Sequence, residues 1–575
     1  MHDVVVRNGL VVDGTGAPAA HGDVAIDGET IVEVTAPGRA GRARHEIDAD
    51  GRLVTPGWVD VHTHYDGQAT WDPELSPSGW HGVTTVVMGN CGVGFAPAAP
   101  ERRDWLIQLM EGVEDIPGTA LAEGMSWNWE TFPEYLDELD RMPRVMDVAA
   151  LVPHGAVRAY VMGERGASNE EATAADVAAM AEIVAEAIRA GAAGFSTTRT
   201  VLHRAKDGQL AAGTTASPDE LLGIGDAMGA AGGGVFELAS DMVVPADEFA
   251  WMAELSRRSG RTVTFNCLQS DVWPEQWREL LRLSDEAAAT GAHIVPQVAG
   301  RPACLLFGLE SSVHPFIANP TYRRIADLPL TERVARMRTP EVRAAILAEQ
   351  IDVGGFANHL LRSFHKLFPL GDPPDYEPTA DASVAAVAGR AGREPIDLAY
   401  DLLVANDGRD MFYMPLNNYA SGNLDDVREM MTAPNVVFGL SDGGAHCNYI
   451  CDATFPTTAV AHWCRDRSRG PGLPLEHVVH HQTQRPARHV GWNDRGVIAP
   501  GYVADLNVID LAALRLHPPR LVADLPAGGT RLLQAADGYR WTVKSGAITF
   551  VDGEWTGATP GRVVRGAQPD PRMRP

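Results

Sequence analysis

The sequence predicts an α/β protein: a TIM (β/α)8 barrel flanked by a small β-sandwich domain that both ends of the chain build together. Over most of the chain, short apolar runs alternate with Ala- and Glu-rich helical segments, which is the pattern of βα units around a parallel sheet. Eight such runs can be counted, the number that closes a TIM barrel. At both ends, apolar and polar residues alternate between Asp-Gly turns, as in antiparallel hairpins.

Residues 1–55 are predicted to form the N-terminal part of the β-sandwich, with turn dipeptides such as Asp27-Gly28. Residues 491–575 repeat this style, most clearly at 539–553, before a tail rich in Arg and Pro. Because neither end alone supplies many strands, we expect the two ends to fold into one domain.

The barrel is predicted within residues 56–490. Its strands are expected at 58–64, 83–90, 148–152, 193–197, 234–238, 263–268, 293–298 and 436–440. An Ala-rich helix is expected at 174–190, ending at Gly191. The connection between the last two strands is far longer than one crossover helix needs, so we expect a helical insertion at about 305–420 that covers the barrel mouth.

Composition excludes several classes of function. A net charge of −27 over 575 residues argues against nucleic acid or an anionic membrane surface as a partner. Six cysteines without framework spacing indicate free thiols, and no secretory signal or long apolar span is visible. These features predict a cytoplasmic protein that acts on a small molecule. The sequence leaves open whether it forms a homo-oligomer.

Two histidines, His62 and His64, follow the first predicted strand. Alternate residues of a strand point to one face, so both imidazoles are expected to project together. Neutral ring nitrogens suit zinc and its first-row neighbours. By itself this spacing is equally compatible with two satisfied polar residues at a strand end.

The active site of a TIM barrel is built from the carboxyl ends of its strands. Polar residues that follow the other predicted strands include Asn90, Cys91, His154, Arg158, Arg199, His203, Cys267, Gln297, Asp442 and His446. Asp442 stands out because a carboxylate after an apolar strand is costly unless it is paired, hydrogen-bonded or bound to a metal. A helix cap beside Gly443 and Gly444 is the alternative interpretation.

Several motifs resemble one known family. They are the stretches 54–66, 82–92, 127–135, 439–442 and 495–506. Together they resemble the amidohydrolase superfamily, and Gly-Asn-Cys-Gly92 favours its D-aminoacylase branch, the N-acyl-D-amino-acid deacylases. The resemblance extends from residue 3 to about residue 510. It implies the amidohydrolase fold, a zinc-type divalent metal and hydrolysis of a linear amide in an N-acyl compound.

The resemblance also implies roles for individual residues. His62, His64 and Cys91 would be metal ligands, and Asp442 would be both a ligand and the general base. A divalent metal lowers the pKa of water and polarises an amide carbonyl, so this donor set suits hydrolysis. Thiolate is too soft a ligand for magnesium or calcium, which favours zinc.

The sequence departs from the branch where histidines are expected after the fifth and sixth strands. Ala239 or Ser240 and then Cys267 occupy these positions. Cys267, Glu237 and His203 are the candidates to complete the metal site in their place.

For the substrate, Arg158 or Arg199 is expected to bind a carboxylate, because guanidinium matches it in a bidentate geometry. Structural ion pairs are the alternative for both arginines. His154, His203 and His446 are further candidates for substrate contacts.

Two competing functions remain. A cyclic-amide hydrolase similar to the hydantoinases would need a lysine at a strand end, and the lysines at 206, 366 and 544 do not lie at one. The other competing function is that of a binding module, a barrel that has lost its catalytic activity.

Overall fold

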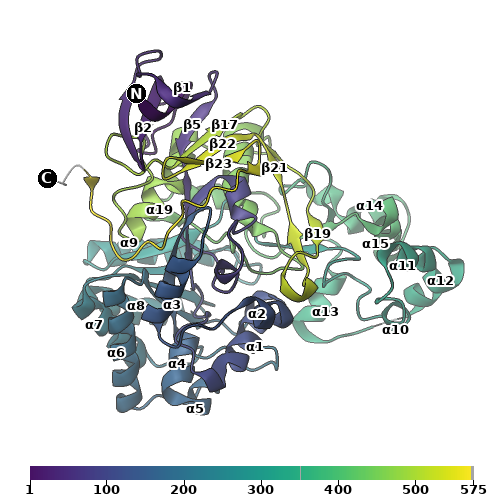
Figure 1. Ribbon diagram of the computed structural model, residues 1–575. Coiled ribbons are helices and arrows are strands. Elements are labelled where there is room, and N and C mark those ends of the chain that lie inside the picture. The colour runs from purple at the N-terminus through teal and green to yellow at the C-terminus, as the bar shows by residue number, and fades with distance from the viewer. Residues whose placement is uncertain (350, 572–575) are drawn as a thin grey trace.

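The barrel is the central element of the computed structural model, which describes residues 1–349 and 351–571 (Figure 1). Within these residues, eight parallel strands lie in the order β16-β12-β11-β10-β9-β8-β7-β6. Their bounds are β6 Trp58–Asp60, β7 Val83–Met88, β8 Asp147–Pro153, β9 Gly194–Arg199, β10 Val235–Ser240, β11 Val263–Asn266, β12 Ile294–Val298 and β16 Val437–Phe438. Each predicted run overlaps one of these strands, so the predicted barrel is confirmed.

The ring of strands closes just beyond β6 and β16. Thr63 and Gly443 form a parallel bridge there, and the His64 amide donates to the Gly443 carbonyl at 2.7 Å. The Asp442 amide donates to the His62 carbonyl at 3.1 Å. The backbone that closes the barrel is therefore the backbone that carries the candidate site.

Helices cover the outside of the barrel. They include α1 Arg103–Glu114, α2 Gly118–Gly124, α3 Phe132–Arg141, α4 His154–Met162, α5 Glu164–Ala167, α6 Ala174–Ala190, α7 Pro218–Ala231, α8 Pro245–Ser259, α9 Gln276–Ala289, α16 Asp425–Thr432, α17 Phe455–Ala461, α18 Leu475–Gln482 and α19 Gln484–His489. Helix α6 has the predicted bounds. Thr173 and Asp176 form a capping box at its start, and Gly191, at φ 110°, ends it in a left-handed conformation.

Both ends of the chain contribute to one mixed sheet beside the barrel, at the top of Figure 1. Its strands are β1 His2–Val11, β2 Ala20–Asp27, β3 Thr30–Thr35, β4 Ala43–Asp48, β5 Leu53–Pro56, β17 Leu506–Ile509, β22 Tyr539–Lys544, β23 Ala547–Val551 and β24 Glu554–Trp555. Strand β5 pairs with β17, which joins the two ends. Val24 and Ile26 share a buried core with Val508 and Val543.

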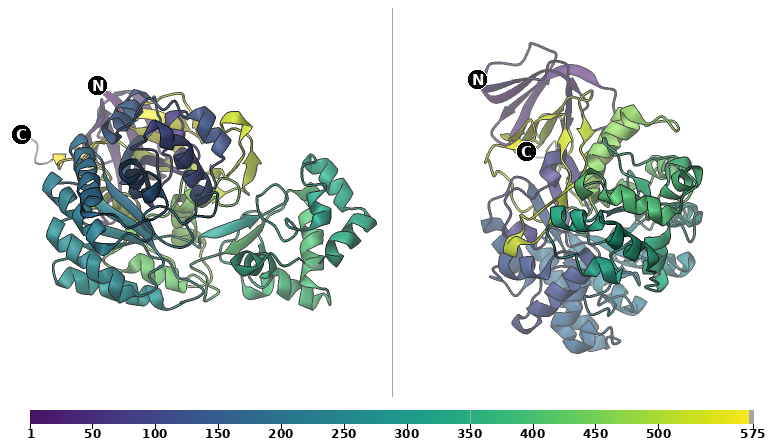
Figure 2. Two further views of the ribbon diagram at one scale, coloured as in Figure 1. Left: turned by 90° about the horizontal axis from the view of Figure 1, so that it is seen from below. Right: turned by 90° about the vertical axis from the view of Figure 1, so that its right-hand side faces the viewer.

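The segment between β12 and β16 forms a lobe with its own core. Its elements are β13 Cys304–Phe307, α10 Pro320–Arg323, α11 Leu330–Met337, α12 Pro340–Ala348, α13 Gly355–Arg362, β14 Phe368–Pro369, α14 Val384–Arg390, α15 Pro395–Val404 and β15 Phe412–Pro415. Strand β15 lies between β13 and β14. Phe316, Tyr400 and Phe412 belong to the core of the lobe. Figure 2 shows its helices projecting beside the barrel.

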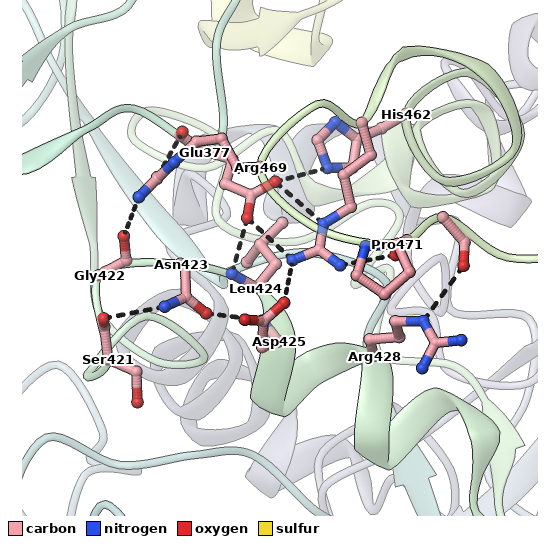
Figure 3. Close-up of polar contacts among 12 residues, drawn as sticks. Glu377, Ser421, Gly422, Asn423, Leu424, Asp425, Arg428, His462, Arg469 and Pro471 are labelled. Carbon is pink, nitrogen blue, oxygen red and sulfur yellow. Dashed lines mark hydrogen bonds and ion pairs between the residues drawn. The ribbon is translucent and has the colours of Figure 1, made fainter.

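A buried polar network fixes the lobe to the barrel (Figure 3). Glu377 of the lobe accepts hydrogen bonds from His462 Nε2 at 3.1 Å and from the Leu424 amide at 2.9 Å. The Arg467 guanidinium contacts Glu377 at 3.1 Å and Asp425, the first residue of α16, at 2.7 Å. One carboxylate therefore joins three segments that are distant in the sequence.

Among the helices of the described residues, none combines the length and the apolar character that crossing a membrane would require.

Candidate metal centre

Three ligand-type side chains converge at the carboxyl end of the barrel. His62, His64 and Cys91 each present one donor atom, and these atoms lie within 4.8 Å of one another. His62 Nε2 lies 3.4 Å from Cys91 Sγ. All three side chains are buried. Two imidazoles and one thiol at this spacing form a donor set that suits a divalent first-row metal.

Asp442 completes the cluster from the other side of the barrel closure. Its Oδ1 lies 3.4 Å from His62 Nε2 and 3.7 Å from His64 Nε2. Its Oδ2 faces away from this pair, 3.8 Å from His446 Nε2. The structure thus brings together the four residues for which the resemblance implies metal binding.

Electrostatic interactions within the cluster determine the protonation states of Asp442 and His64. Burial by itself would raise the pKa of Asp442, but its hydrogen-bonding contact with His64 and its electrostatic interactions with His62 and His446 outweigh burial and lower it. Burial also opposes protonation of His64, yet Glu114 and Asp442 raise its pKa to about 9. Asp442 is therefore a carboxylate at neutral pH.

The pKa values of His62 and Cys91 are shifted in opposite directions. Burial lowers the pKa of His62 to about 4, so its ring is neutral. Burial and the nearby carboxylates of Glu237 and Glu114 raise the pKa of the Cys91 thiol well above its ordinary value. A thiolate at this position consequently requires a cation beside it, because a coordinated thiol loses its proton.

Two side chains behind the histidines orient the rings. The amide oxygen of Gln297 accepts a hydrogen bond from His62 Nδ1 at 2.8 Å, which leaves Nε2 as the unprotonated nitrogen that faces the cluster. Glu114 Oε1 lies 3.4 Å from His64 Nδ1. Glu114 is the last residue of α1, in the connection between β7 and β8, and sequence reasoning missed it because it does not follow a strand.

Several buried polar atoms near the cluster lack a hydrogen-bond partner in the described part of the chain. They are Glu237 Oε1, Asn266 Oδ1 and His446 Nδ1. Buried polar atoms are normally satisfied, so unpaired donors and acceptors around a set of metal-type ligands are what a cation site presents before it binds its ion. The residues present therefore fit a divalent metal.

Strands β10 and β11 each direct one polar side chain toward Cys91. Glu237 is fully buried, and its Oε2 accepts the Cys91 amide at 2.8 Å. Asn266 Nδ2 lies 3.9 Å from Cys91 Sγ. The structure thus places a carboxylate and an amide on the strands after which the branch has histidines.

Cys267, one of the candidates to complete the metal site, is not among the residues that converge there. Asn266, its neighbour on β11, faces Cys91, and successive residues of a strand point to opposite sides. Cys267 is fully buried in the apolar core that surrounds the barrel. It behaves as a small apolar residue, and burial raises the pKa of its thiol to about 12.

Neither Arg158 nor His154 is available to a substrate. Glu220 on α7 accepts bonds from Arg158 NH1 at 2.5 and 2.6 Å and from His154 Nε2 at 2.8 Å. Arg158 and His154 are almost completely buried. The expected substrate contacts are therefore corrected to a structural ion pair, which was the alternative for Arg158.

Arg199 is engaged in a similar way. Its Nε lies 3.0 and 2.9 Å from the two carboxylate oxygens of Glu248, and its NH1 donates to the Ala216 carbonyl at 2.7 Å. A guanidinium that already holds a carboxylate offers little to a second one. The predicted role of Arg199 in substrate binding is not supported by this geometry.

His203 and His446 lie next to the cluster. His203 Nδ1 is 2.9 Å from Thr198 Oγ1, and burial together with the charges of His64 and His446 lowers its pKa to about 3. His446 Nε2 lies 3.6 Å from Glu114 Oε2. His446 Nε2 also lies 3.8 Å from Asp442 Oδ2. Substrate contact by His203 and His446 stays a prediction.

Comparison with known proteins identifies the class. Residues 45–550 match the model of the Amidohydrolase family, so this chain belongs to that family. It is a hydrolase of carbon–nitrogen bonds other than peptide bonds. The superfamily that the sequence motifs indicated is thereby confirmed.

Two relatives in sequence and one solved structure show which enzymes of the family this chain resembles. The chain is 26% identical to a D-aminoacylase of Alcaligenes xylosoxydans xylosoxydans, over 98% of this chain and 97% of the relative. It is 27% identical to an N-acyl-D-aspartate deacylase of the same organism, over 98% and 95%. A solved N-acyl-D-glutamate deacylase from Bordetella bronchiseptica shares the fold, with a TM-score of 0.62 and 24% identity over 98% and 99% of the two chains.

Proposed function

We propose that this protein is a zinc-dependent deacylase of N-acyl amino acids, with the D-configured compounds as its substrates. The observation that carries the proposal is the meeting of His62, His64, Cys91 and Asp442 at the barrel mouth. The similarity to D-aminoacylase and to N-acyl-D-aspartate deacylase over nearly the whole chain supports the substrate class.

His62, His64, Cys91 and Asp442 would hold the metal. A thiolate among the donors favours zinc over magnesium or calcium, and the related N-acyl-D-glutamate deacylase was solved with zinc. When bound, such an ion polarises an amide carbonyl and lowers the pKa of water. Glu237, next to Cys91, is the residue best placed to add an oxygen donor.

Asp442 is the general base in this proposal. Its low pKa keeps it ionised, so it is ready to accept a proton from the attacking water. Oδ1 faces the proposed ligands His62 and His64, whereas Oδ2 lies on the side of His446 and would take the proton and return it to the leaving amine. Hydrolysis of the amide then yields a carboxylic acid and a free amino acid.

A hydantoinase-like activity is disfavoured by the lysines. Lys206 pairs with Glu111 at 2.7 Å, Lys366 pairs with Asp271, and Lys544 lies in the mixed sheet. A metal-bridging lysine would have to stand at a barrel strand end. A linear amide is accordingly the better substrate.

The test is Asp442→Asn in the purified enzyme. We expect kcat/KM for N-acyl-D-amino acids to fall about a hundredfold to ten-thousandfold, the range typical of a lost general base. Exposed Asp207→Asn is the matched control and should keep full activity. Metal content measured on the same samples separates loss of the base from loss of the ion.

Three results would contradict the proposal. They are an Asp442→Asn enzyme with full metal and undiminished activity, wild-type protein without stoichiometric metal, and hydrolysis that does not discriminate between D and L enantiomers. The last would refute only the stereochemical part.

A further inference from the structure

Three consecutive loops at the carboxyl end of the barrel each expose a pair of large apolar side chains. These residues, the apolar rim, are Val201 and Leu202 after β9, Val243 and Val244 after β10, and Val272 and Trp273 after β11. Leu202 is 69% exposed and Val272 is 72% exposed. Apolar side chains that gather at the surface mark a binding site more often than singly scattered ones do.

Hydrogen bonds join these loops into one surface. The Val201 amide donates to Asp241 Oδ2 at 2.9 Å, which links the loop after β9 to the loop after β10. Gln276 Nε2 donates to the Met242 carbonyl at 2.8 Å, which links the loop after β10 to the start of α9. The three pairs are therefore held side by side on neighbouring strands.

The apolar rim and the metal centre lie at the same end of the barrel, because the loops of the rim follow strands β9, β10 and β11. His203, which directly follows Leu202, lies 2.9 Å through its Nδ1 from Thr198 Oγ1 near the carboxyl end of β9. Strands β10 and β11 carry Glu237 and Asn266 toward Cys91 and then continue into the loops that expose the other two pairs. A substrate held at the centre would therefore extend along this rim.

The charges beside the rim are already paired. Arg199 is bound by Glu248, Lys206 by Glu111 and Lys366 by Asp271. This side of the mouth consequently presents apolar contacts more than a partner for a carboxylate. An N-acyl amino acid has one apolar part, its acyl chain.

We propose that the apolar rim binds the acyl chain of the substrate and that the enzyme prefers N-acyl amino acids with long, unbranched acyl groups to N-acetyl compounds. This inference rests on the proposed deacylase function and adds the substrate class.

A homologous series of one N-acyl amino acid, from acetyl to dodecanoyl, tests this inference in the metal-loaded enzyme. We expect kcat/KM to rise roughly twofold to fourfold with each added methylene until the rim is covered, as burial of methylene groups predicts. Replacing Leu202 and Val243 by serine should lower the ratio of dodecanoyl to acetyl activity by about tenfold or more. Val32→Ser, an exposed apolar residue on β3, is the matched control and should keep the wild-type ratio.

The outcomes separate the two proposals. Hydrolysis of the whole series at equal kcat/KM would refute the role of the rim and leave the deacylase function intact. Absence of hydrolysis across the series would refute both. Sedimentation of the wild type and of the variant with both serine substitutions tests the alternative that the rim joins two copies of the chain. A dimer that the serine substitutions dissociate, with an unchanged activity ratio, would show that the rim joins two copies of the chain and would overturn the inference.

Discussion

At the scale of single residues, the candidate site carries backbone strain. Cys91, Leu440, Asp442 and His446 have φ values of 57°, 65°, 48° and 54°, in the left-handed region that residues other than glycine rarely adopt. Such conformations cost of order 1–3 kcal/mol each and persist where the surrounding structure imposes them. Here they occur at two proposed metal ligands and two of their neighbours, as expected if the loops are shaped to aim side chains.

The two buried cysteines at the ends of β7 and β11 allow a direct test of ligand identity. Cys91→Ala should lose most of the bound metal, since it removes the proposed thiolate donor. Cys267→Ala should keep the metal and lose only about 1–2 kcal/mol of unfolding free energy, because it deletes a small buried apolar group. Elemental analysis and urea unfolding of both variants measure these quantities.

Cobalt substitution provides a second readout. A thiolate bound to cobalt gives a charge-transfer band in the near ultraviolet, which should be present in wild type and Cys267→Ala and absent in Cys91→Ala. Retention of the band in Cys91→Ala would contradict the proposed ligand set.

Sequence reasoning located the residues that directly follow strands, because the barrel geometry decides where those side chains go. His62, His64, Cys91 and Asp442 were found in this way. Glu114 was missed, since it arrives on a helix between two strands. The partners of the two arginines were not predicted for the same reason, because Glu220 and Glu248, the carboxylates that bind them, lie on helices α7 and α8.

At the scale of elements, the two strands at the barrel closure are shorter than predicted. The Asp60 side chain accepts the His62 amide at 3.2 Å, a local turn that ends β6 at Asp60. Strand β16 ends at Phe438, shortly before Leu440 turns left-handed. The hydrophobic pattern locates strands, but it does not show where a side chain binds a backbone amide and thereby ends the strand.

The element that fixes the lobe to the barrel is the network around Glu377. Glu377→Gln should lower the free energy of unfolding by about 3 kcal/mol, because it leaves the buried Arg467 without its main charge partner. Exposed Glu332→Gln, which weakens only a helix-surface pair, is the control and should be nearly neutral. Denaturant unfolding at pH 7 measures both.

The same network predicts a pH dependence. Burial opposes ionisation of Glu377, but His462 and Arg467 outweigh it and lower its pKa from 4.5 to about 2. A carboxyl group with a depressed pKa stabilises the folded state fully above its unfolded pKa and loses this contribution as pH falls toward the folded value. The stability difference between wild type and Glu377→Gln should therefore shrink between about pH 4.5 and pH 2. A difference that stays constant over this range would argue against the ion pair.

At the scale of the whole molecule, a buried ionic group joins the barrel to the mixed sheet. Lys544 on β22 contacts Asp147 on β8 at 3.0 Å and Asp505 at 3.0 Å. Arg495 reaches the same Asp147 at 2.7 Å. All four side chains are buried, so the two parts of the molecule share charges that neither can neutralise alone.

Removing the shared lysine should weaken both parts together. Lys544→Met leaves Asp505 and part of Asp147 without compensation, so the free energy of unfolding should fall by about 3 kcal/mol. The surface change Lys206→Met is the control. Calorimetry should show one transition, shifted to lower temperature. A variant that instead unfolds in two separate transitions would show that the barrel does not depend on the sheet.

The barrel and the mixed sheet could be predicted from the sequence because each leaves a local pattern of apolar and polar residues. The sequence predicts the lobe as a helical insertion that covers the barrel mouth, whereas its helices project beside the barrel (Figure 2). Its strands β13, β14 and β15 come from distant parts of the segment and pair with one another, and such long-range pairing leaves little trace in local pattern.

The closure of the barrel has a consequence for the order in which the protein acquires its activity. His62 and His64 leave the ribosome early, whereas Gly443 and Asp442, which complete both the ring and the cluster, emerge only after the lobe has been made. During synthesis the growing chain holds two histidines and a cysteine without their carboxylate. The cofactor is thus expected to be acquired after translation of the barrel is complete.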